Sequence, residues 1–226
     1  VAKNCGAAEK NRKKNFAKGE PPMGADALRA TLAALNTSGR YIRLSVDRVE
    51  GYRNFINKLW NASRFALMNL DGHDADGFES QLASNQQVTL TLADRWILSR
   101  LQRVATEVEA ALESFRFSDA ANALYQFVWH ELCDWYIELA KPHLRLPNDG
   151  SAPSPQRKVA QGVLALVLER TLRMLHPIIP FVTEEIWQKL PKPGHLPASL
   201  MITVYPRCED ALLDAGAERE MALVQE

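Results

Sequence analysis

One stretch in the second half of the chain carries the residue types that acid–base or metal chemistry uses. His130, Glu131 and Asp134 lie close together, with Cys133 between them. Adjacent residues on an α-helix point about 100° apart, and a carboxylate four residues after a histidine has the spacing of an ordinary surface pair. Cys133 has apolar neighbours, which favours a small core residue over a nucleophile. We therefore assign no catalytic residue and no metal ligand here.

The motifs that usually identify nucleotide, zinc or acyl-transfer chemistry are absent from the sequence. It contains no GxGxxG, no Walker A loop, no HExxH and no GxSxG. The three cysteines, Cys5, Cys133 and Cys208, are far apart and lack CxxC spacing. They indicate neither a disulfide framework nor a zinc site, and they fit a reducing, cytoplasmic setting.

A polar stripe with one aromatic residue runs along a helix expected over residues 46–70. At helical spacing, one face carries Gly51, Asn54, Lys58, Asn61 and Phe65, flanked by Arg48 and Arg64. Such a face offers a nucleic-acid base a ring for stacking, amides for hydrogen bonds and cations for phosphates. The alternative is that Phe65 packs on a neighbouring helix while the amides face solvent. The pattern alone favours neither.

The elements around this stripe predict an all-α, antiparallel helical bundle. The expected buried face of helix 46–70 consists of Val49, Tyr52, Ile56, Leu59, Ser63 and Ala66. Apolar periodicity and breakers predict further helices over 26–35, 95–112, 118–142, 159–176, 181–190 and 210–225. Thr91 and Ser118 are the expected caps of the third and fourth of these seven helices, and Asp94 follows Thr91 at the third position. Residues 71–87 are expected to form a surface loop, and residues 199–205 an isolated strand-like run.

The composition predicts a folded domain without a membrane span. The 226 residues are 46% hydrophobic, and 27 basic residues balance 27 acidic ones, so net charge gives no argument for nucleic-acid binding. A cluster of basic residues precedes residue 19: Lys3, Lys10, Arg12, Lys13, Lys14 and Lys18. Such a cluster forms either a solvated tail or helix face, or a contact with phosphates. Because the chain begins with Val1 and ends inside an expected helix, we expect it to be part of a longer protein.

Several sequence blocks resemble the valyl-tRNA synthetases, in one order along the chain. The most specific is EGYRNFINKLWNASRF at 50–65. Supporting blocks are GADALR (24–29), LADRWI (92–97), FRF (115–117), CDWY (133–136) and HPIIPFVTEEIW (176–187). The DALR tetrad and the last block are shared with the related isoleucine and leucine enzymes, whereas the LWNASRF run favours valine.

The resemblance implies a class Ia anticodon-binding bundle over 23–206. Residues 1–22 would then lead in from an absent catalytic domain, and 207–226 would begin the connection to a C-terminal arm. The parent enzyme would join valine to its tRNA, using ATP and magnesium, as a cytoplasmic monomer with catalytic and editing domains outside this chain. No HIGH-type or KMSKS-type signature is present. The valine tRNA is the implied partner.

The resemblance also implies roles for the stripe. Phe65 would stack on an anticodon base, and Lys58 would contact the backbone or a base edge. Asn54, Asn61, Arg48 and Arg64 complete the expected contact set. The family commonly has a basic residue among the anticodon contacts at position 47, whereas this chain has Asp47. The anticodon contact of that residue is then either made by Arg48 or lost. The alternatives are the equivalent isoleucyl or leucyl domain, or a non-catalytic helical interaction module derived from one.

Overall fold

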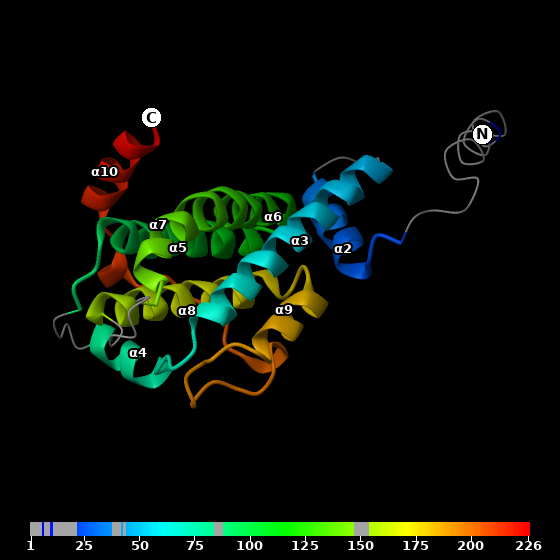
Figure 1. The fold of residues 1–226 in the computed structure, drawn as a ribbon. Coiled ribbons are helices and arrows are strands. Elements are labelled where there is room, and N and C mark those ends of the chain that lie inside the picture. The colour runs from blue at the N-terminus through cyan, green and yellow to red at the C-terminus, as the bar shows by residue number, and fades with distance from the viewer. Residues whose placement is uncertain are drawn as a thin grey trace.

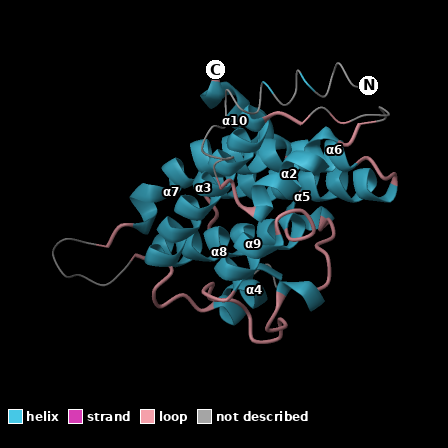
Figure 2. Ribbon diagram, turned by 90° about the vertical axis from the view of Figure 1, so that its right-hand side faces the viewer, coloured by secondary structure: helices cyan, strands magenta, loops and turns pink. Residues whose placement is uncertain are grey.

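The chain folds around one long buried helix in a bundle of antiparallel helices, as the computed structural model shows (Figures 1 and 2). The structure describes residues 6, 10, 22–37, 42, 44–83, 88–146 and 154–226. Within those ranges every regular element is helical, which confirms the predicted all-α fold. Of the N-terminal basic cluster, all residues except Lys10 lie outside the described residues.

The α-helices are α2 (Ala25–Leu35), α3 (Val46–Asn69), α4 (Ala75–Ala83), α5 (Leu92–Glu113), α6 (Phe117–Gln126), α7 (Ile137–Leu144), α8 (Pro155–Leu175), α9 (Pro180–Trp187) and α10 (Ala215–Gln225). A π-helical segment, η1 (Phe127–Tyr136), joins α6 to α7, and two 3₁₀ turns, η2 (Leu200–Ile202) and η3 (Asp210–Leu212), precede α10.

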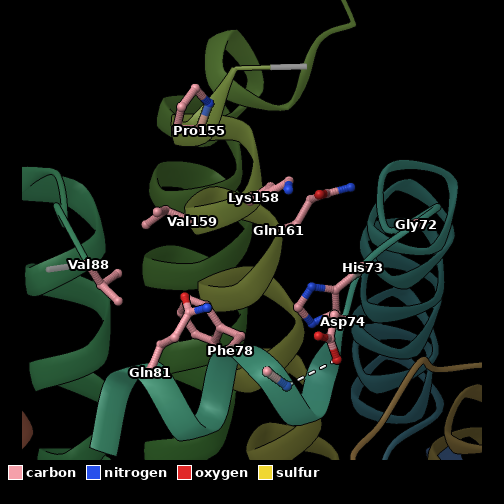
Figure 3. A pocket seen from close by; sticks show the side chains of 11 residues that line it. Gly72, His73, Asp74, Phe78, Gln81, Val88, Pro155, Lys158, Val159 and Gln161 are labelled. Carbon is pink, nitrogen blue, oxygen red and sulfur yellow. Dashed lines mark hydrogen bonds between the residues drawn. The ribbon is translucent and has the colours of Figure 1, made fainter. Parts of the chain in front are cut away.

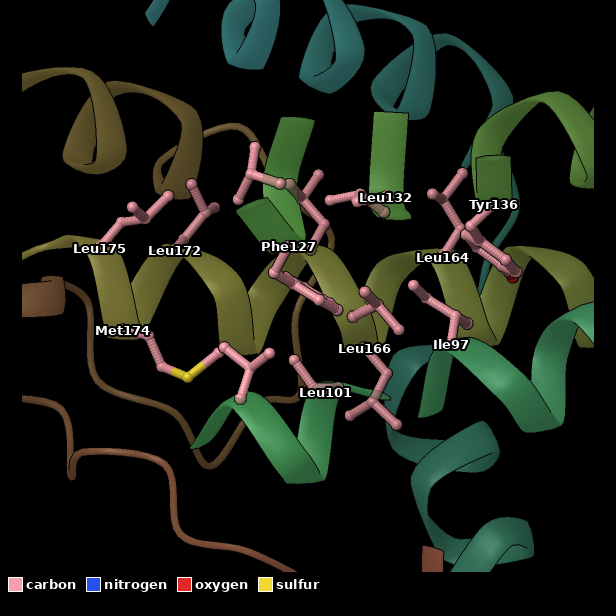
Figure 4. Packing of buried hydrophobic residues seen from close by; sticks show 14 of the residues in the cluster. Ile97, Leu101, Phe127, Leu132, Tyr136, Leu164, Leu166, Leu172, Met174 and Leu175 are labelled. Carbon is pink, nitrogen blue, oxygen red and sulfur yellow. The ribbon is translucent and has the colours of Figure 1, made fainter. Parts of the chain in front are cut away.

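Helix α8 is the centre of the core. It is buried on every side, because α3, α4, α5, α6, α7 and α9 all pack against it. Ser154 begins the helix by accepting a hydrogen bond from the backbone N–H of Arg157, with Pro155 at the first helical position. Leu164 and Leu172 are among its fully buried side chains, and they pack with Ile97, Phe127 and others between the layers (Figure 4).

Pairs of the sequence blocks contact each other in the fold. In α2, Asp26 accepts hydrogen bonds from the backbone N–H groups of Phe181 and Val182, at the start of α9. Arg29 donates to the carbonyls of Pro177 and Ile178. These bonds satisfy polar backbone groups that the α8–α9 turn cannot satisfy itself. They fix α2 on that turn, so the DALR tetrad and the HPIIPF block form one structural unit.

The start of α5 confirms the predicted cap. The Thr91 hydroxyl accepts from the Asp94 backbone N–H at 3.2 Å, and Asp94 accepts from the Thr91 backbone N–H at 3.0 Å. The other carboxylate oxygen of Asp94 accepts from the buried Tyr136 hydroxyl at 2.9 Å. Because Asp94 is buried, this one side chain joins α5 to the end of η1.

The predicted cap at Ser118 is wrong. Phe115 takes a left-handed backbone conformation with φ 55°, so the N–H of Arg116 bonds back to Ala111 at 2.8 Å and closes α5 tightly. Helix α6 therefore begins at Phe117, and Ser118 is buried within its first turn. The continuous helix expected to Pro142 is instead α6, η1 and α7 in succession, and α7 continues past Pro142 to Leu144.

Two further expectations are wrong. Residues 71–87 were expected to be loop only, yet they contain α4, whose first turn is capped by Asp74 accepting from the Gly77 N–H. The ring of Phe78 anchors α4 on α8. Residues 199–205 do not form a strand: they begin with η2, and the extended residues after it have no strand partner within the described chain.

The contact between α4 and α8 generates a stability prediction. A Cβ placed on Gly162 would lie 2.2 Å from the Phe78 ring, whereas one on Gly51 in α3 meets nothing within 4 Å. We expect Gly162→Ala to lower the free energy of unfolding by about 1–3 kcal/mol through overpacking. The matched Gly51→Ala should raise it by about 0.5–1 kcal/mol. Urea unfolding measures both, and a Gly162 variant as stable as the Gly51 variant would contradict the packing described.

Candidate nucleic-acid interface

The polar stripe of α3 lies at the surface, apart from two of its members. Arg48, Asn54, Asn61 and Arg64 are exposed, whereas Lys58 and Phe65 are half-buried. The buried face of α3 matches the prediction at Val49, Leu59, Ser63 and Ala66; Phe55 is buried as well, and Tyr52 and Ile56 are only partly covered. Of the six predicted contact residues, Asn54, Lys58, Asn61 and Phe65 share one side of α3, Arg64 lies at its edge, and Arg48 lies in the first turn at the angular position of the buried face.

Lys58 is bound on two sides by residues of η1. Its Nζ lies 2.5 Å from Oδ1 of Asp134 and 4.0 Å from the centroid of the Trp129 ring. The Trp129 ring also stacks on Tyr125, with centroids 5.5 Å apart and planes at 14°. Tyr125 in turn stacks on the buried Phe55. A column of rings therefore rises from the core and ends at the ammonium group of Lys58.

The π-helical form of η1 explains why these two residues meet Lys58 together. Trp129 and Asp134 are five residues apart, which in an α-helix separates them by about 140° around the axis. In a π-helix the backbone hydrogen bonds connect residues five apart, so such positions come nearly into line. Both side chains then face the same lysine of α3, against which η1 packs.

Phe65 combines the two alternatives that the sequence left open. The ring packs against the core but remains partly accessible. Nζ of Lys141 in α7 lies 5.7 Å from its centroid, and Lys141 also pairs with Glu138 at 2.5 Å. The partly accessible ring thus already has one cation over it.

Two buried side chains of α8 position the helices that carry these residues. Arg157 donates to the carbonyl of Leu144, the last residue of α7, and to that of Asn69, the last residue of α3. Gln161 donates to the same Asn69 carbonyl at 2.6 Å and to Asp71. These bonds satisfy carbonyls that the ends of α3 and α7 leave unpaired, and they fix the two helices relative to each other.

The acid–base candidates have ordinary partners. Nδ1 of His130 lies 3.3 Å from Oδ2 of Asp134, which is the surface pair expected from the sequence. Glu131 accepts two hydrogen bonds from Arg100, each 2.8 Å, and this raises the pKa of the guanidinium. Within the described ranges, His, Cys, Asp and Glu form no group of three that could hold a metal ion. The cluster is therefore explained by pairing.

A cavity of about 320 Å³ lies elsewhere, between α4 and the first turns of α8 (Figure 3). Two of its polar residues have structural roles: Asp74 caps α4, and Gln161 binds the loop carbonyls. Burial lowers the pKa of His73, which keeps its ring neutral near pH 7. The described lining residues include none of the six predicted contact residues, so this cavity is separate from the polar stripe of α3.

The comparison with known families decides what this bundle is. The family model described as the anticodon-binding domain of tRNA ligase matches residues 94–226, from α5 through α10. The chain belongs to this anticodon-binding family. The match covers α8 and η1, the elements that position α3, although α3 itself lies before it.

Curated relatives extend the likeness of this anticodon-binding domain over α3. A protein named valine--tRNA ligase from Geobacter sulfurreducens is 51% identical over 88% of this chain and 22% of its own length. Those of Syntrophotalea carbinolica and Dechloromonas aromatica are 54% and 43% identical over 77% and 97% of the chain, which is 18% and 23% of theirs. The resemblance predicted from the sequence is confirmed. The chain spans about a fifth of these relatives.

A solved structure shows the same fold at low sequence identity. It is described as the ternary complex of Agrobacterium radiobacter K84 agnB2 LeuRS with tRNA and LeuAMS. The likeness has a TM-score of 0.57 at 20% identity and covers 85% of this chain and 20% of that one. It supports the helical architecture of the anticodon-binding domain.

The contacts of three residues with Lys58 and Phe65 were not predicted from the sequence. Trp129 and Asp134 contact Lys58, and Lys141 lies beside Phe65. Their positions depend on how η1 and α7 lie against α3, which helical periodicity within one element does not report. A cue was available for Asp134, because it belongs to the CDWY block.

Burial predicts that two cysteines, Cys133 and Cys208, differ in their reactivity toward an alkylating reagent. Burial raises the pKa of Cys133 to about 12, whereas Cys208 is partly exposed. At pH 8, about one Cys133 thiol in ten thousand is then ionised, and only the thiolate reacts. We expect iodoacetamide to modify Cys208 within minutes and to leave Cys133 intact in the folded chain, as peptide mass mapping will measure. Equal modification of both sites would contradict the burial described.

Proposed function

We propose that this chain is the tRNA-anticodon-binding part of a valine–tRNA ligase, and that α3 carries the contact surface. The observation that carries the proposal is the accessible face of α3, where Asn61, Arg64 and Phe65 offer amides, a cation and a ring together. The assignment of valine as the amino acid rests on the relatives named valine--tRNA ligase. Lys58 would contribute its ammonium from the same face.

The chemistry of the parent reaction would take place outside this chain. ATP and magnesium, which such a ligase uses, would bind to the catalytic part of the parent enzyme. The contribution of this domain is therefore to bind and orient the tRNA. The parent would be a cytoplasmic enzyme. None of the helices in the described ranges combines the length and apolar character that crossing a bilayer requires.

A titration with RNA tests the proposal. The chain is mixed with valine tRNA and with a version whose anticodon is changed, each at two salt concentrations. Discrimination that survives the higher salt supports a specific anticodon reader, because phosphate contacts alone weaken steeply with salt. Equal, salt-sensitive binding of both tRNAs would mean that the chain contacts phosphates without reading the anticodon. Absence of binding would favour the helical interaction module, for which zero net charge and the exposed Asp47 are the supporting observations.

Phe65 gives the proposal a mutational test. We expect Phe65→Leu, which keeps an apolar side chain against the core, to weaken binding of the anticodon stem-loop by about 1–3 kcal/mol, since aromatic stacking of a base is lost. Phe181→Leu is the matched control, because Phe181 is an exposed phenylalanine on α9. Fluorescence anisotropy measures the affinity and thermal unfolding checks the fold. A folded Phe65 variant with unchanged affinity would remove Phe65 from the contact set.

A further inference from the structure

Lys58 and Asp134 place a hydrogen-bond donor and an acceptor side by side at the surface. The side chains are 26% and 43% exposed, so a ligand can reach both. An ammonium group has three donors, and Asp134 uses one of them. Each carboxylate oxygen can accept two hydrogen bonds, and Asp134 has one close partner at each: Lys58 at Oδ1 and His130 at Oδ2. Both groups retain capacity for a ligand.

The pair is also held in one orientation. The Lys58 ammonium lies over a Trp129 ring that also stacks on Tyr125, and the column continues to the buried Phe55. The Trp129 ring therefore already has two close partners, one cation and one ring. The role of the column is to fix Lys58, and through it the ion pair, on the side of α3 that carries Phe65.

A carboxylate on a surface that binds RNA needs its own explanation. Asp134 repels phosphates, so a surface built only for backbone contact would be stronger without it. A carboxylate accepts hydrogen bonds and never donates them at neutral pH, and in base recognition it pairs with exocyclic amino groups. Lysine is its complement, because it donates to ring nitrogens and carbonyl oxygens. Side by side, the two groups match an amino group next to a ring acceptor.

We infer that Asp134 is a specificity-determining residue: with Lys58 it selects an anticodon adenine or cytosine. The carboxylate accepts from the exocyclic amino group, and the ammonium donates to the adjacent ring nitrogen. Guanine and uracil present the reverse order at the same two positions, a carbonyl and a ring N–H, so they place acceptor against acceptor and donor against donor. This inference rests on the proposed function, and it adds a residue that discriminates bases rather than one that adds affinity.

The sharpest test is Asp134→Asn, which keeps the size of the side chain. An amide can turn its NH₂ toward the carbonyl of guanine or uracil, which removes the clash at position 134, while the clash of Lys58 with the ring N–H remains. The probes are the stem-loop of valine tRNA, with the adenine and cytosine that pair with valine codons, and two variants with adenine→guanine or cytosine→uracil. Wild-type protein should lose about tenfold to a hundredfold in affinity for one of these variants. In Asp134→Asn the ratio of the affinity for the valine stem-loop to that for this variant should fall by about threefold or more.

Glu185→Gln is the matched control. Glu185 pairs with Lys189 at 2.5 Å, and Lys189 lies 5.3 Å from the centroid of the Trp60 ring, which repeats the carboxylate–lysine–tryptophan arrangement where α9 packs on α3. This control removes the same charge and should keep the wild-type ratio. A second variant, Lys58→Met, should weaken binding of all three probes, and thermal unfolding confirms that each variant is folded.

The outcomes separate the inference from the proposed function. A wild-type ratio retained in Asp134→Asn, with all three affinities shifted equally, would overturn the role of Asp134 while leaving anticodon binding intact. The loss of discrimination only in Asp134→Asn supports it. Wild-type protein that binds none of the probes, or binds all three equally, would overturn both.

Discussion

The geometry of the α3 surface depends on two polar side chains buried in the central helix. Arg157 and Gln161 bind the carbonyl of Asn69, and Arg157 also binds that of Leu144. A polar group buried without a partner costs about 1–3 kcal/mol, so these bonds strongly disfavour any other placement of the two helix ends. Because α3 carries Lys58 and Phe65 and α7 carries Lys141, the core determines the spacing of groups at the surface.

A second connection between core and surface runs through the aromatic column. Phe55, Tyr125 and Trp129 stack in sequence, and the ammonium of Lys58 completes the column. A lysine side chain on an open helix surface samples many rotamers, and ordering it on binding costs about 2 kcal/mol or less. Here most of that cost is met during folding. The surface is therefore preorganised at Lys58, whereas Arg48 and Arg64 are exposed and more adaptable.

The sequence predicted the helices well where one element's own pattern decides them. The capping box of Thr91 and Asp94 is local, and the uninterrupted apolar content of α8 indicates a helix surrounded by others. Helix α4 was missed because its stability comes from Phe78 packing on Gly162, a contact between segments far apart in sequence. The stripe was predicted as a surface, but the partners of Lys58 were not, since an α-helical spacing rule places Trp129 and Asp134 on different faces.

The π-helical segment has a consequence for how this domain tolerates insertions and deletions. A π-helix holds more residues per turn than an α-helix, so the loss of one residue between Trp129 and Asp134 would let ordinary α-helical hydrogen bonds form. In such a shortened chain, Trp129 and Asp134 would stand four residues apart, about 40° around an α-helix, so both side chains could still face Lys58. At these two contacts the domain would therefore tolerate a one-residue deletion, whereas the present length aligns the same side chains through π-helical hydrogen bonds.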